Sequence, residues 1–439
     1  NSGNNNNQSD ITNSYFYPGG AVYEPATLVT NNGSGNNNQV TFQADFVNPV
    51  NENKKVEAGI RIYHNEFKSI YNAYADDNGQ PVKLPLSNNY KYDQQVNAAY
   101  FTYTNKKGKF GYQLGLRAEY SKFDGLLIDS AYKFGYRYPD KISKIGDAFF
   151  PSVFLSETVG ENNELQFNFS RRIRRPDFWQ LNPFIDINDP ANLRQGNPQL
   201  RPEFINSFEF NFSQNYKKGN ILYVLYFRNN PADITQYSDT ITTEQYQQLN
   251  NAGVDRNAIL NTFINASTTN RYGAEFTVQH KFSKNFDITP SLNFQYRTVK
   301  ADIKGLNLSN KGFNWQGKLA TNYKIVLENE RSVFNGLGFQ LSGQYESPRV
   351  IPQGKRDARY SVDMALKREF LKNNKASLTL GVNDVFNTDR YGLIYDTDLF
   401  YQELYRRRNV RNFRVTLSYK FGKADFSLMK RNNRNENDD

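Results

Sequence analysis

The chain has 439 residues, a formal net charge of +10, no cysteine and only two histidines, His64 and His280. The missing cysteines exclude disulfides, thiolate metal sites and cysteine nucleophiles. Two histidines so far apart in sequence leave little for general-base catalysis, so we expect no enzyme, no cofactor and no metal site. The positive charge is spread along the chain, which disfavours a nucleic-acid-binding protein.

The first segment, residues 1–37, is rich in asparagine and glycine, and we expect a polar N-terminal segment or an extracellular loop. Residues 11–30 could form an additional strand. However, Pro18, Gly19, Gly20 and Pro25 argue against a strand there, because proline removes a ladder hydrogen bond and glycine weakens a strand interior.

From residue 38 onward the dominant pattern has a period of two. In Arg411–Phe421, for example, apolar and polar residues alternate throughout. Successive side chains of a strand point to opposite faces, so each such segment has one apolar and one polar face. This pattern predicts about 15 strands, near residues 38–48, 55–74, 90–105, 109–126, 145–157, 163–172, 203–216, 219–237, 264–282, 285–303, 311–325, 332–346, 357–370, 375–388 and 406–422.

The connections between these strands alternate in length. Short polar turns, such as Asn105–Lys109 and Leu371–Lys375, are separated by long loops, and Glu244–Phe263 inside one of them is the best candidate for a short helix. Short turns at one end and long loops at the other are typical of transmembrane β-barrels. We therefore expect strands and long extracellular loops over residues 38–422 and a polar periplasmic tail over residues 423–439.

The composition favours a membrane protein over a soluble one. Hydrophobic residues make up only 38% of the chain and aromatic residues 15%. A barrel in lipid needs apolar residues only at alternate positions and places aromatic residues at both interfaces. A soluble sheet with one wet face is the alternative, but it would have to protect long strand edges. No run of about 18 apolar residues predicts a transmembrane helix.

One loop carries the most distinctive residues. It contains RRxxRPxxxxLNPF followed by GNPxLxPE, and motifs elsewhere in the chain follow a matching order. With these motifs the chain resembles the C-terminal barrel region of TonB-dependent outer-membrane transporters. The residues that carry the resemblance are Arg171, Arg172, Arg175, Pro176, Leu181, Asn182, Pro183, Phe184, Gly196, Asn197, Pro198, Leu200, Pro202 and Glu203, with Phe42–Pro49, Gly115–Ser121, Phe149–Ser156, Asn270–Phe276, Gly381–Thr388 and Tyr419–Gly422.

The resemblance implies an antiparallel barrel of about 22 strands, of which these would be the last 15. It also implies a plug domain and a TonB-type energy-coupling protein as partners, beside outer-membrane lipid and lipopolysaccharide. A surface lipoprotein or other outer-membrane subunits are further expected partners. The implied function is active import of a metal chelate, glycan or peptide. A non-transporting scaffold subunit and a passive 16-stranded pore remain the alternatives.

Side-chain parity assigns the candidate site residues. If parity continues beyond each strand, Arg172, Arg174, Arg406 and Arg408 point into the lumen, where with Phe178, Trp179 and Tyr401 they would bind the ligand. Arg171, Arg175, Arg407 and Arg411 would point outward to lipopolysaccharide phosphates, since planar guanidinium suits phosphate. Solvated rim charges and loop-packing aromatics are the alternative readings. Loop acids such as Asp186 and Asp396 are expected to be solvated.

Overall fold

A computed structural model describes residues 2–77, 80–83, 87–187, 189–249, 254–303, 306–329, 332–371, 374–407 and 411–421. Among these residues, no helix is both long and apolar enough to cross a membrane. Strands dominate instead, and the long antiparallel ladders expected from the period-two pattern are present. The tail over residues 423–439 and Arg408 lie outside the described residues.

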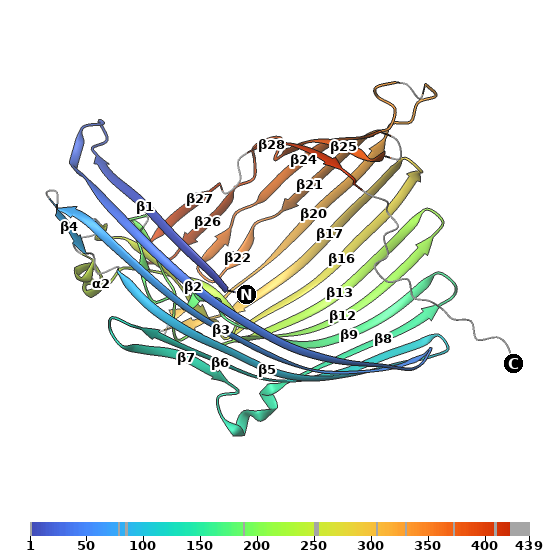
Figure 1. The fold of residues 1–439 in the computed structure, drawn as a ribbon, viewed down its shortest axis with the longest axis horizontal. Coiled ribbons are helices and arrows are strands. Elements are labelled where there is room, and N and C mark those ends of the chain that lie inside the picture. The colour runs from blue at the N-terminus through green and yellow to red at the C-terminus, as the bar shows by residue number, and fades with distance from the viewer. Residues whose placement is uncertain are drawn as a thin grey trace.

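One sheet of 18 strands forms the wall of the molecule. In it, β4 (Gln80–Lys83) pairs only with β3, and β7 (Tyr132–Tyr138) occupies the edge of β6 above β8. The other 16 follow one another in chain order, all antiparallel (Figure 1). They are β1 (Ser2–Phe16), β2 (Val22–Asn51), β3 (Lys54–Asp77), β5 (Asn88–Lys107), β6 (Phe110–Leu127), β8 (Phe149–Val159), β9 (Asn163–Arg174), β12 (Glu203–Tyr216), β13 (Gly219–Pro231), β16 (Thr268–Ser283), β17 (Phe286–Lys300), β20 (Asn310–Lys324), β21 (Leu337–Glu346), β24 (Arg359–Phe370), β25 (Ala376–Asn383) and β28 (Asn412–Tyr419).

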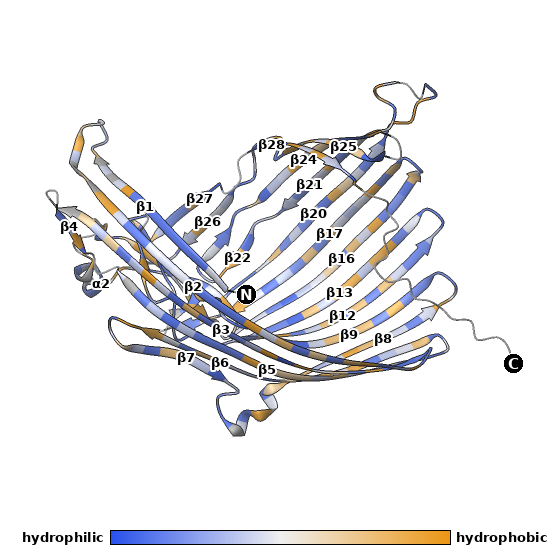
Figure 2. Ribbon diagram, viewed as in Figure 1, coloured by the Kyte–Doolittle hydropathy of each residue, from blue (hydrophilic) through white to orange (hydrophobic). Residues whose placement is uncertain are grey.

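The wall has two chemically different faces. In β17, Leu292 and Phe294 are 37% and 42% exposed on one face, and Asn293 between them lies on the other. The apolar row continues into β20, where Phe294 pairs with Trp315. Figure 2 shows this alternation along the wall strands. We call the apolar side the outer face and the polar side, against which the long loops pack, the inner face.

The sheet is curved, and β1 and β28 do not pair with each other in the described residues (Figure 1). Both ends of the sheet therefore present strand edges. Unpaired backbone groups are costly in lipid, where no water can satisfy them. In a bilayer the edges of β1 and β28 must therefore be paired.

The wall has 16 strands where about 15 were expected, because residues 1–37 form β1 and the first part of β2. Their asparagine-rich stretches pair with each other, from Ser2 opposite Asn38 onward. Pro18 and Gly20 lie in the turn between the two strands, where Gly20 has a φ of 85°. Pro25 lies where the ladder is irregular. The breakers that argued against a strand therefore occupy the turn and the irregularity.

Other expected ends of strands, and the extent of one helix, differ from the structure. The strand expected over 219–237 stops at Pro231, because Ala232 has a φ of 58° and a separate strand, β14 (Ile234–Thr240), follows. The final strand begins at Asn412 and not at Arg406, which ends a loop strand. Within the segment Glu244–Phe263, where a helix was expected, the helix is the short α2 (Thr243–Gln248), which is capped by Thr242. The last residues of that segment belong to a strand, β15 (Ile259–Asn265).

The long connections build two small sheets at the end of the wall opposite the short turns. The first loop sheet has the order β10 (Ile185–Asp186), β11 (Asn192–Gln195), β15 and β14. The second loop sheet has the order β22 (Arg349–Ile351), β23 (Gly354–Arg356), β26 (Tyr391–Asp396) and β27 (Tyr401–Arg406). Shorter elements are η1 (Ile142–Ala148), α1 (Phe178–Leu181) and a hairpin of β18 (Asp302–Ile303) and β19 (Leu306–Asn307).

The assignment of faces predicts different costs for charges at neighbouring positions. Leu292→Arg places a guanidinium on the outer face and should lower the free energy of unfolding in a bilayer by about 2–4 kcal/mol near the midplane. Asn293→Arg, one residue away on the inner face, should lower it by less than about 1 kcal/mol. Urea unfolding of both variants in liposomes measures the difference, and equal losses would contradict the assignment.

Candidate functional site

The loop from Arg175 to Pro202 folds against the inner face of the wall. At its start Arg175 forms an ion pair with Glu119 of β6, whose carboxylate also accepts from Arg117 at 2.7 Å. Burial, with Arg117 and Arg61 nearby, lowers the pKa of Arg175 to about 10, so its guanidinium stays protonated at neutral pH. Arg175 was expected to point outward, but β9 ends at Arg174, so strand parity does not extend to it.

The short helix α1 then fastens the loop to the wall. The Asp177 side chain accepts from the Gln180 backbone N–H at 2.9 Å, which begins the helix with a reciprocal capping box. Phe178 stacks on Tyr90 of β5 with ring centroids 4.8 Å apart, and Tyr92 lies 5.7 Å away. Phe178, which we expected to contact a ligand, thus packs on the inner face. Its neighbour Trp179 is 74% exposed and remains available for stacking.

The remaining loop motifs provide a small hydrophobic core. Leu181 and Leu200 are each 1% exposed and pack together with Phe123 of β6 and Ile234 of β14. Gly196 leaves no room for a side chain, since a Cβ there would lie 2.5 Å from the Asn182 nitrogen and oxygen. These motif residues therefore set the position of the loop inside the wall.

Two charged residues of the wall hold the first residue of β14 by both of its backbone groups. The buried carboxylate of Glu203 accepts the Ile234 N–H at 2.6 Å through Oε2. Its Oε1 accepts from Arg174 Nε at 2.5 Å, and another Arg174 nitrogen donates to the Ile234 carbonyl at 3.4 Å. Because the ends of β9 and β12 supply the two side chains, the first loop sheet is attached to the wall at Ile234.

The residue before Ile234 is attached to two further wall strands. Asp233 is 4% exposed, and its Oδ2 accepts from Thr269 of β16 at 2.6 Å and from Arg297 of β17 at 3.3 Å. Arg271 lies 3.7 Å from its other oxygen. A buried carboxylate is tolerated only with such partners, so Asp233 fixes the loop in one arrangement. We call the contacts of Asp233 and Ile234 with the wall the anchor.

The two loop sheets are joined by a glutamine. The Gln353 side chain, between β22 and β23, accepts the Ser238 N–H and donates to the Ser238 carbonyl, each at 2.7 Å. Ser238 belongs to β14, the edge strand of the first loop sheet, so the amide occupies the place of a neighbouring strand. Both residues are buried. The two loop sheets with α1 and the anchor form what we call the cap.

The alternation of apolar and polar residues did not identify the residues that hold the cap. Asp233 was expected inside a continuous strand, although the Pro-Ala-Asp sequence at Pro231–Asp233 is a signal of a strand end. Glu203 was expected only as the last residue of a motif and the first residue of a strand. Nothing in the local sequence around Gln353 or Arg297 indicates their distant partners.

The structure places the other predicted site residues as follows. Arg172 is an exposed residue of β9, and Arg174 is part of the anchor. Arg171 lies 3.4 Å from Asp147 and over the Phe204 ring. The remaining predicted residues are exposed and lie in or next to the second loop sheet or the final strand: Tyr401, Arg406, Arg407 and Arg411. The Tyr401 hydroxyl donates to the Glu403 carboxylate at 2.5 Å.

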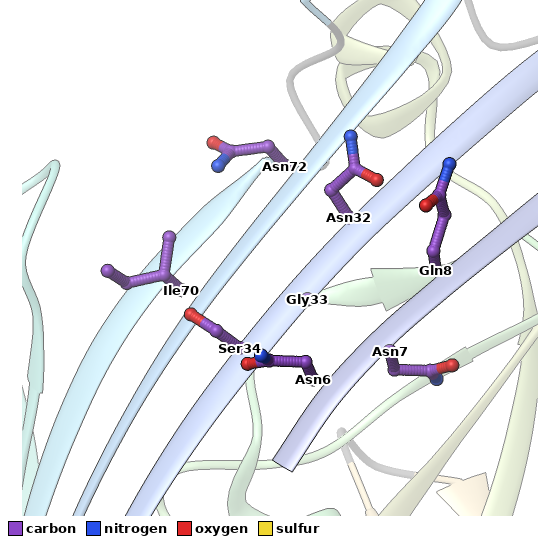
Figure 3. Close-up of a pocket in the computed structure, with 8 residues that line it drawn as sticks. All are labelled: Asn6, Asn7, Gln8, Asn32, Gly33, Ser34, Ile70 and Asn72. Carbon is purple, nitrogen blue, oxygen red and sulfur yellow. The ribbon is translucent and has the colours of Figure 1, made fainter. Parts of the chain in front are cut away.

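A pocket of about 350 Å³ on β1, β2 and β3 is lined by uncharged residues, mostly amides (Figure 3). Asn32 and Ser34 have the same parity as the exposed Val40 and Phe42, so this pocket lies on the outer face. It is therefore separate from the cap. No group of three or more His, Cys, Asp or Glu residues within the described ranges could hold a metal ion.

Residues 1–419 match the model of the family described as outer membrane protein beta-barrel family. No curated protein sequence matches the chain. Solved structures share its fold at low identity, and the chain spans between 54% and 59% of the length of the three named next.

The FrpB iron transporter from Neisseria meningitidis is 14% identical with a TM-score of 0.51, and the match covers 90% of this chain and 56% of that chain. The ferric yersiniabactin uptake receptor FyuA from Yersinia pestis is 11% identical with a TM-score of 0.54, and the match covers 96% of this chain and 59% of that chain. The ferripyoverdine receptor of the outer membrane of Pseudomonas aeruginosa is 12% identical with a TM-score of 0.52, and the match covers 96% of this chain and 54% of that chain.

The stacking of Phe178 predicts how the cap can be loosened. Each aromatic pair contributes about 0.5–1.5 kcal/mol beyond its buried area, so Phe178→Ala should speed protease cleavage within residues 175–202 roughly tenfold. Trp179→Ala removes a larger but exposed ring and should leave cleavage unchanged. Limited proteolysis of both variants in liposomes tests this, and equal rates would show that Phe178 does not hold the loop.

Proposed function

Because the chain belongs to the outer membrane protein β-barrel family, we propose that it forms the wall and the extracellular cap of an active importer in the outer membrane. Membership confirms the expected barrel class and location. The names of the similar structures describe an iron transporter and receptors for ferric yersiniabactin and ferripyoverdine. Among metal chelates, glycans and peptides, metal chelates are therefore our first choice of substrate.

The observation that carries this proposal is the anchored cap. Buried charges at Glu203 and Asp233 tie the first loop sheet to four wall strands, and Gln353 ties it to the second. Burying carboxylates costs several kcal/mol unless they are paired in good geometry. An importer gains a rigid recognition surface at the mouth.

The exposed groups on this surface favour an anionic, planar ligand. Arg172 lies on the polar face of β9, and Trp179 of α1 has most of its side chain exposed. Guanidinium groups bind carboxylates and phosphates in bidentate geometry, and an indole stacks on flat groups. Arg406 and Tyr401 of the second loop sheet are exposed and available as further contacts.

The remaining machinery belongs to our proposal as partners. The wall has unpaired edges at β1 and β28 in the described residues. Preceding strands and a plug domain would close and fill it, and a TonB-type protein would supply energy. Arg171, Arg407 and Arg411 are proposed to face lipopolysaccharide phosphates, with surface lipoproteins or other outer-membrane subunits as additional partners.

Uptake in whole cells tests the proposal. Cells with and without the intact gene are supplied with a panel of labelled ferric chelates, oligosaccharides and peptides, with and without a protonophore that collapses the proton gradient. We expect at least one solute to accumulate only with the gene and only with the gradient. Entry that persists without the gradient would identify a passive pore, and a panel without any gene dependence would identify a scaffold.

The recognised solute then tests the role of Arg172. A hydrogen bond to a charged group contributes about 1.5–3 kcal/mol, so Arg172→Ser should raise the half-saturating concentration for uptake at least tenfold. Arg407→Ser removes another exposed arginine at the loop end of the wall and should leave the half-saturating concentration unchanged. Equal uptake by both variants at normal surface levels would remove Arg172 from the ligand path.

A further inference from the structure

Three arginines lie directly opposite one another on neighbouring wall strands, which Figure 1 shows side by side. Arg228 of β13 pairs with Arg271 of β16, and Arg271 pairs with Arg297 of β17. All three are on the inner face, because Arg297 has the parity of Asn293 and directly opposite residues share a face. Like charges in directly opposite positions destabilise a sheet, so this arginine row requires negative charge around it.

The two ends of the arginine row differ in their exposure. Asp233 of the anchor lies 3.3 Å from Arg297 and 3.7 Å from Arg271, whereas Arg228 donates to Glu209 of β12 at 2.9 Å. The exposed fraction of the side chain rises along the row, from 8% at Arg297 to 24% at Arg271 and 41% at Arg228. The anchor therefore covers the Arg297 end, and the Arg228 end is exposed on the inner face.

Positive charge exceeds negative charge around the row. Burial lowers the pKa of the Arg349 guanidinium in the second loop sheet; nearby Glu346 opposes this, while Arg356 and Arg271 add to it. Glu346 also lies 3.7 Å from Arg356. The Nε atoms of Arg349 and Arg297 are buried without a hydrogen-bond partner. We call these residues the arginine cluster, which holds five positive and three negative charges: Arg228, Arg271, Arg297, Arg349 and Arg356 with Glu209, Asp233 and Glu346.

Tyr226 orients the exposed end of the row. The Arg228 guanidinium carbon lies 4.6 Å from the centre of the Tyr226 ring. The ring lies over Gly273, where a Cβ would collide with it. The Tyr226 hydroxyl accepts from Gln295 and donates to Asn293, each at 2.9 Å. Because Arg228 is held in this way before a ligand arrives, binding costs less conformational entropy.

Small side chains continue the row beyond Arg228. Ser207 of β12 lies opposite Arg228, and Ser170 of β9 and Ser152 of β8 follow at the same level of the wall. None of these side chains extends as far from the wall as a guanidinium, so a ligand can reach Arg228 from this side. Their hydroxyl groups can also donate hydrogen bonds to an anion.

We propose that the Arg228 end of the arginine row binds a solute that carries at least two carboxylate or phosphate groups. Neighbouring strands lie about 4.8 Å apart, so Arg228 and Arg271 can each bind one oxyanion of the same molecule. Guanidinium groups bind such oxyanions through two parallel hydrogen bonds. Glu209 competes with the ligand, because its carboxylate occupies Arg228 when the site is empty.

The site continues the recognition surface at the mouth. Arg172 follows Ser170 at the next inner-face position of β9, two strands away from Arg228. A solute that leaves Arg172 therefore meets the arginine row next. This inference rests on the proposed function for its role in import, and it narrows the substrate to a multiply charged anion. The binding itself requires no transport.

Calorimetric titration of the purified full-length protein in nonionic detergent with tricarballylate, a small tricarboxylate, tests the site. Arg228→Gln should weaken binding at least tenfold, because one oxyanion loses its guanidinium. Glu209→Gln should strengthen binding several-fold, because Arg228 then has no competing carboxylate, and a folding defect cannot produce this gain. Arg414→Gln removes an inner-face arginine that lies opposite Gly381. It is the matched control and should bind as the unaltered protein does.

Acetate tests the need for two oxyanions and should bind the unaltered protein at least tenfold more weakly than tricarballylate. Equal affinities for the two ligands, unchanged binding in Arg228→Gln or weaker binding in Glu209→Gln would each overturn the site. An equal loss in Arg414→Gln would show a response to net charge alone and overturn it as well.

Binding and uptake separate this inference from the proposed function. If the variants change tricarballylate binding as stated but no solute enters cells in a gradient-dependent way, the site stands and import is refuted. If a solute is imported but the variants bind tricarballylate like the unaltered protein, import stands and the site is refuted.

Discussion

The rest of the cap depends on the buried carboxylate of Glu203. It lies between the Arg174 guanidinium and the Ile234 N–H, at 2.5 Å and 2.6 Å. A carboxylate buried without partners would cost several kcal/mol. The ends of β9 and β12 and the start of β14 must therefore stay together for the chain to fold as it does. With Asp233 held alongside, the first loop sheet has one position relative to the wall.

This constraint explains what the loop motifs do. Leu181, Leu200 and Gly196 shape the connection between β9 and β12, so that it packs inside the wall and meets the first loop sheet. Gln353 then extends the arrangement to the second loop sheet. The motifs that made the family recognisable thus support the structure of the cap.

The wall could be predicted from the sequence because one physical rule governs it. Alternation between lipid and lumen repeats at every strand, so β12 was placed at its observed ends and β5 and β17 within a few residues. The rule failed where it no longer applied. Alternation ended with β9, so Arg175 turned inward, and the first part of β1, Ser2–Asp10, has no apolar side chain to mark a face. The cap was beyond prediction because its contacts join residues such as Asp233 and Arg297, 64 positions apart.

Hydrogen exchange at β14 tests the central claim most directly, since the amides of Ile234–Thr240 are protected only while the cap stays anchored. In Glu203→Gln the carboxylate is lost with almost no change in shape, and the account predicts roughly tenfold faster exchange across Ile234–Thr240. Exchange in β17 should not change. Glu209→Gln, which loses a 2.9 Å contact with Arg228 on the inner face, should leave β14 protected. Unchanged exchange of β14 in Glu203→Gln would contradict the account.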